Sequence, residues 1–166
     1  SMQAAFNAAA AIQAGHLDVV VAAGVESMSR VPMLSNLGPE GFAGLHEKIA
    51  IRWPIVPQGI SAEEIAREWK LSREQLDAYA LESHRRALAA IDEGRFEGEI
   101  VPIPLEDGGL FAVDETPRRD TSPERLASLK PAFLEEGVVT AGNASQIVDG
   151  SAAMLLASEA AVTRLG

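Results

Sequence analysis

Two short, wholly apolar runs flank a long segment of mixed hydrophobic spacing. The first run, Val19 to Ala23, follows an alanine-rich segment, residues 2–14, that stops at Gly15. Ala has the highest helix propensity and Gly commonly ends helices, so residues 2–14 predict a helix. Consecutive apolar positions are typical of a strand that is covered on both faces of its sheet. The pattern therefore predicts a helix, a turn and a buried strand, which is half of an α/β unit.

The second apolar run, Ala152 to Ala157, lies near the end of the chain and predicts another buried strand. Ser158 follows it and predicts the cap of a last helix. The segment between the two runs is far longer than connections within compact domains usually are. Two strands and two helices cannot bury both faces of a sheet. We therefore expect further structure to complete it.

The first part of the intervening segment, residues 28–59, predicts an irregular loop, because Pro32, Pro39, Pro54 and Pro57 interrupt it together with several glycines. Next to this loop, Ser61-x-x-Glu64 matches a capping box and predicts a short helix over residues 61–69.

A second capping box, Ser72-x-x-Gln75, predicts a longer helix that Gly94 ends. Beyond it, the turn "DGG" between "EIVPIPLE" and "LFAVDE" predicts an irregular hairpin. Ser122-Pro123 then predicts another short helix, with Pro at its favoured first position. The expected apolar face of the longer helix consists of Leu76, Tyr79, Ala80, Ala87, Leu88 and Ile91.

Composition narrows the functional classes. Apolar residues make up 47% of the 166 residues and charged residues 23%, which favours a folded, soluble protein. A formal charge of −10 argues against a nucleic-acid partner, although a local basic patch can still bind a small anion. The apolar runs are too short to span a membrane, and no signal peptide is recognisable at the start. Cysteine is absent, which excludes disulfides, thiolate metal sites and a Cys nucleophile from these residues.

The titratable residues give weak signals by themselves. His16, His46 and His84 have no metal-ligand spacing, so we interpret them as surface residues and expect no metal site. The pairs Glu63-Glu64 and Glu135-Glu136 are interpreted as solvated carboxylates at helix ends and turns. Arg118-Arg119 is interpreted as a solvated pair, although Arg there could meet a phosphate.

The segment "TAGNAS", residues 140–145, allows two interpretations. In the first, Gly142 and Asn143 supply unusual backbone angles in an ordinary turn. In the second, the small residues let a ligand lie against the backbone, with Ser145 as a hydrogen-bond donor. Spacing alone favours the turn.

Longer segments carry a family resemblance. The chain closely resembles the thiolases over essentially its whole length, and "GVVTAGNASQIVDGSAA" is the most specific part of the match. The other matching segments are "DVVVAAGVESMSR", "GISAEEIAREWKLSREQLDAYALESHRRALAAIDEGRFEGEIVPI" and "LKPAFLEEGVVTAGNASQIVDGSAAMLLASEAA".

The resemblance implies an α/β fold, namely part of the thiolase-like layered α/β/α core with a large inserted α+β loop domain. Residues 1–27 would supply a helix and strand of the N-terminal core. Residues 28–146 would be the inserted loop domain that binds coenzyme A (CoA), and residues 147–166 would return to the core with a strand and a helix. The two apolar strands would then be neighbours in one mixed sheet.

The resemblance also implies thiolysis of 3-oxoacyl-CoA by CoA, or the reverse condensation, through an acyl-enzyme on a Cys. In thiolases that Cys lies at the start of the helix that residues 2–14 resemble, and a His and a second Cys belong to the C-terminal half. The present chain should therefore be inactive alone. One alternative is a thiolase-like acyl-CoA or lipid carrier without a nucleophile, and another is a purely structural fragment. Ketoacyl synthases share the core fold but lack the insertion.

The residues that carry over from the family contact CoA. Arg118 matches a residue at the nucleotide end, Phe133 an aromatic of the pantetheine channel, and Ala141 and Ser145 two positions along pantetheine. CoA would be a substrate and no covalent cofactor is implied.

Where biosynthetic short-chain thiolases carry His-Met, this chain has Pro57-Gln58. These two residues are acyl-pocket candidates, and they suggest a degradative enzyme of fatty acid β-oxidation. Residues 28–45 match a segment that builds tetramers, so we expect a homo-oligomer, dimer or tetramer, and a cytoplasmic location.

Overall fold

The computed structural model describes residues 2–44, 46–53 and 55–166. Pro54, one of the prolines of the predicted irregular segment, and Leu45, the end of the predicted tetramer segment, lie outside the described residues. The chain forms two compact units. The first unit contains the chain up to Ile49 together with Ile147–Gly166, and the second contains Ala50–Gln146.

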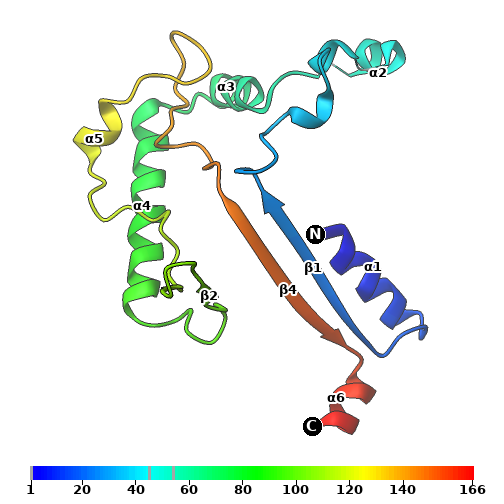
Figure 1. Ribbon diagram of the computed structural model, residues 1–166. Coiled ribbons are helices and arrows are strands. Elements are labelled where there is room, and N and C mark those ends of the chain that lie inside the picture. The colour runs from blue at the N-terminus through cyan, green and yellow to red at the C-terminus, as the bar shows by residue number, and fades with distance from the viewer. Residues whose placement is uncertain (1, 45, 54) are drawn as a thin grey trace. The chain divides into compact units, whose positions relative to one another are not determined.

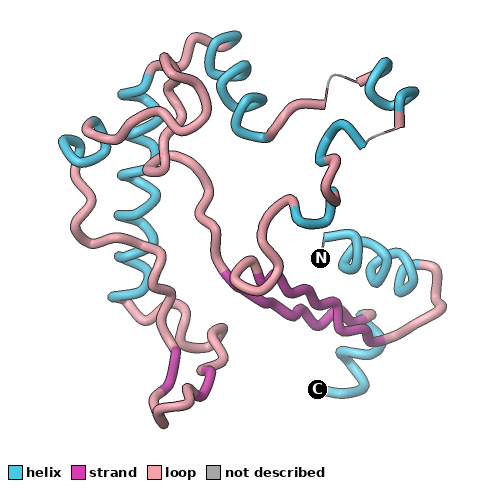
Figure 2. Tube along the Cα trace, turned by 45° about the horizontal axis from the view of Figure 1, so that its top comes forward, coloured by secondary structure: helices cyan, strands magenta, loops and turns pink. Residues whose placement is uncertain are grey.

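The first unit is built on two strands that are distant in sequence and adjacent in space (Figure 1). Strand β1 (Val19–Ser27) pairs antiparallel with β4 (Asp149–Ala157), in a register that joins Val19 to Ala157 and Ser27 to Asp149. Helix α1 (Met2–Gln13) contacts both strands, and Figure 2 shows it running beside them. The prediction that the two apolar strands are neighbours is confirmed.

The elements of the first unit follow their sequence signals closely. Gly15 has φ 74°, and the His16 N–H donates to the Ala11 carbonyl at 2.9 Å, which closes α1 as predicted. The Ser158 hydroxyl accepts from the Ala161 N–H at 3.1 Å and caps α6 (Glu159–Leu165). Both strands are longer than their apolar runs, because pairing continues to the polar positions Ser27 and Asp149.

The strands are not buried within this chain. Val21 is 65% exposed, Val25 77% and Leu155 68%, and among the described residues of β1 only Ala22 is buried. A single helix can cover only one face of a two-stranded sheet. The predicted cover on both faces is therefore absent from these residues. The segment that was expected to be irregular also contains two 3₁₀ turns, Ser35–Leu37 and Gly41–Gly44, and the helix α2 (Glu47–Arg52).

The second unit begins with helix α3, which corrects the sequence prediction. This helix spans Gln58–Glu68 with Pro57 as its N-cap, so the capping box at Ser61 is wrong. The fixed φ of proline suits a helix start, and the Ser61 N–H already donates to the Pro57 carbonyl at 3.1 Å. Ser61 is therefore an interior residue of the first turn.

Helix α4 spans Arg73–Asp92 and carries the predicted capping box. The Gln75 N–H donates to the Ser72 hydroxyl at 3.3 Å, and the Ser72 N–H donates to the Gln75 side-chain oxygen at 2.8 Å. Gly94, with φ 69°, follows the helix end as expected. Tyr79 departs from the predicted apolar face, because it is 81% exposed whereas Asp77 is buried.

The remaining elements of the second unit are short. Strands β2 (Ile103–Pro104) and β3 (Leu110–Phe111) form the predicted hairpin, and α5 (Pro123–Ala127) starts at the predicted cap Ser122. The buried positions of this unit include three apolar residues and three polar ones, which are Ala66, Leu126, Val139, Glu63, Asp77 and Thr140. No helix in the described ranges is long and apolar enough to cross a membrane.

Candidate functional site

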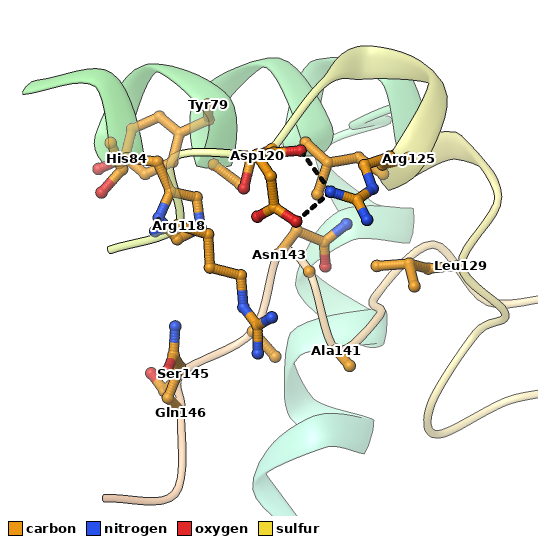
Figure 3. A pocket seen from close by; sticks show the side chains of 16 residues that line it. Tyr79, His84, Arg118, Asp120, Arg125, Leu129, Ala141, Asn143, Ser145 and Gln146 are labelled. Carbon is orange, nitrogen blue, oxygen red and sulfur yellow. Dashed lines mark hydrogen bonds and ion pairs between the residues drawn. The ribbon is translucent and has the colours of Figure 1, made fainter. Parts of the chain in front are cut away.

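A pocket of about 590 Å³ lies within the second unit. Its walls are helix α4, the segment from Arg118 to Leu129 that contains α5, and the loop Ala141–Gln146 (Figure 3). The size falls within the range of small-molecule sites. Its lining includes Tyr79, Ser83, His84, Arg118, Asp120, Arg125, Leu129, Asn143 and Ser145.

The structure brings together three of the six residues that the family resemblance singles out. Arg118, Ala141 and Ser145 line this one pocket. Phe133, Pro57 and Gln58 are not part of its lining. Phe133 instead packs against Gly59, the residue after Gln58, where an added Cβ would come within 2.2 Å of the ring.

The two adjacent arginines have different surroundings. Arg119 forms a two-point ion pair with Asp92, with Nη1–Oδ2 and Nη2–Oδ1 distances of 3.0 and 2.6 Å. Arg118 forms no ion pair within the described part of the chain. Its backbone N–H donates to His84 Nδ1 at 3.2 Å, and its side chain extends toward the loop that carries Ala141 and Ser145 (Figure 3). The pocket therefore contains one guanidinium whose charge is not compensated by these neighbours.

The other charges of the pocket compensate each other. Arg125 pairs with the carboxylate of Asp120 and also donates to the Asp120 carbonyl oxygen at 2.8 Å. The Arg125 hydrogen bond holds the pKa of Asp120 below its usual range. Asp120 therefore stays ionised at neutral pH and pairs with Arg125, while the more distant charge of Arg118 contributes to the lowered pKa of Asp120 without forming an ion pair in the described residues.

The predicted backbone role of Gly142 and Asn143 is wrong, since neither residue has a positive φ. Gly142 is required by space instead. A Cβ at this position would lie 2.6 Å from side-chain carbons of both Leu126 and Leu129. The loop therefore packs its backbone directly on α5.

A polar network that sequence reasoning missed holds the loop. The Asn143 amide donates to Asp77 Oδ1 at 2.8 Å and to the Val138 carbonyl at 3.1 Å, while its oxygen accepts from the Thr140 N–H at 2.8 Å. The Thr140 hydroxyl accepts from the Gly142 N–H at 3.1 Å, and Thr140 is completely buried. These bonds determine the conformation of the turn that borders the pocket.

Glu63 was expected to be solvated, and this interpretation is also wrong. Its side chain is buried, and its two carboxylate oxygens accept from the N–H groups of Val138 and Val139, each at 2.9 Å. The helical spacing of Gly59, Glu63 and Ala66, all buried on α3, is the sequence signal that could have identified this face. Glu64, Glu135 and Glu136 are exposed, as predicted.

The histidines differ from one another. His16 and His46 are exposed as predicted, whereas His84 is partly exposed and its Nδ1 accepts a hydrogen bond from the Arg118 N–H. Within the described ranges, no cluster of His, Cys, Asp and Glu could hold a metal ion.

Comparison with known proteins gives a consistent result. The family model of the thiolase N-terminal domain matches residues 1–160. A probable acetyl-CoA acetyltransferase of Escherichia coli is 43% identical over 96% of the chain and 44% of its own length. A steroid 3-ketoacyl-CoA thiolase of Mycobacterium tuberculosis is 44% identical over 98% of the chain and 41% of its own length.

Solved structures of thiolases are also similar to the chain. The dimeric peroxisomal thiolase of Saccharomyces cerevisiae matches 98% of the chain with a TM-score of 0.87 and 38% identity, and 42% of that protein is covered. Human mitochondrial 3-ketoacyl-CoA thiolase in complex with CoA matches 99% with a TM-score of 0.82 and 35% identity, and 44% of it is covered.

The chain thus spans less than half the length of these relatives. It is α/β in class, and both its sequence and its fold match over nearly all described residues. The chain belongs to the thiolase family.

Proposed function

We propose that the protein carrying this chain is a thiolase that transfers acyl groups to CoA. It cleaves a 3-oxoacyl-CoA with a second CoA to give acetyl-CoA and an acyl-CoA shortened by two carbons. The relatives support this proposal, since they include acetyl-CoA acetyltransferases and 3-ketoacyl-CoA thiolases. Pro57-Gln58 favours the degradative direction, because the family resemblance implies His-Met at this place in biosynthetic short-chain thiolases.

The observation that carries the proposal is the composition of the pocket in the second unit. Arg118 supplies a positive charge that a nucleotide phosphate can neutralise. The loop Ala141–Gln146 offers small side chains and the Ser145 hydroxyl. Among the described residues, the N–H groups of Ala144, Ser145 and Gln146 donate no hydrogen bond. A thin ligand with amide groups, such as pantetheine, can accept from them.

In this proposal the second unit is the CoA-binding insertion and supplies binding, while the nucleophile is supplied by another part of the protein. The 166 residues contain no Cys. Holding CoA in one orientation contributes to thiolysis by converting a bimolecular encounter into a reaction between positioned groups. The protein is further proposed to form at least a dimer, since the similar peroxisomal thiolase of Saccharomyces cerevisiae is dimeric.

The test uses the protein that carries this chain at its native length. CoA affinity is measured by calorimetry, and thiolysis of 3-oxoacyl-CoA substrates of increasing chain length by chromatography of the acetyl-CoA formed. CoA binding together with stoichiometric acetyl-CoA production is expected. CoA binding without turnover would replace the proposal by an acyl-CoA carrier, and absence of CoA binding would overturn both.

A further inference from the structure

Asp77 is a buried carboxylate that bonds the lining residue Asn143 but is not itself part of the pocket lining. It is a residue of α4, and each of its oxygens accepts one hydrogen bond. Oδ2 accepts from Arg73 Nε at 2.7 Å, and Oδ1 accepts from the side-chain amide of Asn143 at 2.8 Å. Water cannot replace the Arg73–Asp77 bond without a large loss of free energy, because the Asp77 side chain is only 9% exposed and that of Arg73 19%.

Each partner of Asp77 leads to a different wall of the pocket. Arg73 also donates through Nη2 to the Leu126 carbonyl oxygen, which belongs to α5. Asn143 belongs to the loop wall and bonds the backbone at Val138 and Thr140. Asp77 therefore holds the Arg73 side chain that bonds α5 and the Asn143 side chain that belongs to the loop.

The α5 wall and the loop wall are also closely packed against each other. The backbone of Gly142 lies so close to Leu126 and Leu129 that a single added carbon would come within 2.6 Å of both. A shift of either wall therefore changes the distance from Ala141 and Ser145 to Arg118, which all border the same pocket. Binding sites lose affinity when the groups that contact the ligand are not held in place before it arrives.

We propose that Asp77 is a positioning residue for CoA: it sets the spacing of the two pocket walls through Arg73 and Asn143 without touching the ligand. This inference rests on the proposed function of the pocket. It assigns to a buried charge of α4 a role in the affinity for CoA and none in the chemical step.

Asp77→Asn is the decisive variant because it keeps the size of the side chain. A carboxylate accepts from two donors, whereas an amide presents one acceptor and one donor, so either Arg73 or Asn143 loses its partner. We expect the Kd and KM for CoA to rise about tenfold, the effect of one lost hydrogen bond to a buried charge. The kcat at saturating CoA should stay within about twofold of that of the unchanged protein.

Two further variants make the result specific. Glu82→Gln removes an exposed ion-pair partner of Arg85 and Arg86 on the same helix, away from the pocket, and should leave KM unchanged. Asn143→Ala should raise KM by itself. In the double variant Asp77→Asn/Asn143→Ala, the rise should be smaller than the two single effects combined, because the substitutions share the Asp77–Asn143 contact.

The outcomes separate the two proposals. If the unchanged protein does not bind CoA, the proposed function fails. If it binds CoA and Asp77→Asn leaves Kd and KM unchanged, the inference about Asp77 is overturned while the proposed function stands. A fall in kcat with constant KM also overturns it, because loss of folded protein has that signature. Should Asp77→Asn not fold, Arg73→Gln decides, because Arg73 bonds Asp77 from outside the pocket lining: an unchanged KM overturns the inference and a raised KM supports it.

Discussion

The Glu63 carboxylate accepts a hydrogen bond from the Val139 N–H at 2.9 Å across 76 positions of sequence. Its second oxygen accepts from the adjacent Val138 N–H at the same distance. Gly137 lies so close that a Cβ there would come within 2.2 Å of Glu63 Oε1. This carboxylate thereby ties α3 to the segment that leads into the pocket loop.

Replacing Glu63 by Ala should destabilise the protein. Two backbone N–H groups would lose their acceptor in a buried place, and each such loss costs about 1–3 kcal/mol. We expect the free energy of unfolding to fall by about 2–5 kcal/mol, as measured by urea denaturation. Glu64→Ala on the same helix is exposed and serves as the control, with an expected change below about 0.5 kcal/mol. Equal effects of the two substitutions would contradict a buried role for Glu63.

Gly59→Ala should also destabilise the protein, because the new methyl group overlaps the ring of Phe133. Overpacking of this kind costs about 1–3 kcal/mol. Thermal denaturation should show a lower Tm for Gly59→Ala. When Phe133 is also replaced by Ala, the Gly59→Ala substitution should lower the Tm much less. Gly98→Ala is the matched control, since nothing lies within 4 Å of a Cβ there. A Gly59→Ala protein as stable as Gly98→Ala would show that the ring can move aside freely.

Arg118→Ala should weaken CoA binding by about tenfold, the effect of losing one charged contact to a phosphate. Arg119→Ala is the matched control, because Arg119 is already paired with Asp92. Calorimetric titration with CoA at two salt concentrations distinguishes them. Only in Arg118→Ala should the affinity for CoA become less dependent on the salt concentration. Comparable losses in both variants would assign the anion contact to the pair rather than to Arg118.

Asp149 gives a prediction for pH. The Ser29 hydroxyl lowers its pKa, with help from the Ser29 N–H, which donates to it at 2.9 Å. A lowered pKa in the folded state means that the stabilisation is complete above the unfolded value, near 3.9, and is lost as the pH falls through the lowered value. In Ser29→Ala the pKa of Asp149 should rise toward its ordinary value, as measured by NMR titration of the carboxyl group. An unchanged titration midpoint would contradict the hydrogen bond as the cause.

The chain by itself should show no thiolysis, since it contains no Cys to form an acyl-enzyme. It should also self-associate, because β1 and β4 expose apolar side chains at paired positions, such as Val21 and Leu155. Light scattering and an activity assay on the purified 166 residues test both expectations. Thiolysis by this chain would overturn the assignment of the nucleophile to another part of the protein.

Local signals predicted much of the secondary structure. The capping box at Ser72, the glycine at Gly15 and the cap at Ser158 act through bonds over a few residues, so the sequence near them is sufficient. The capping box at Ser61 failed, because Pro57 offered an earlier helix start and an identical motif inside a helix cannot act as a cap.

The sequence by itself determined most of the helices, the two apolar strands and, through its most specific motif, the family. Only the tertiary structure decided which polar residues are buried. Glu63, Asp77 and Asn143 look like ordinary helix and turn residues, and their roles depend on partners 53 to 76 positions away, directly or through Arg73. The reason is physical: the burial of a charge is stable only when its distant partners arrive, and no local pattern encodes where they are.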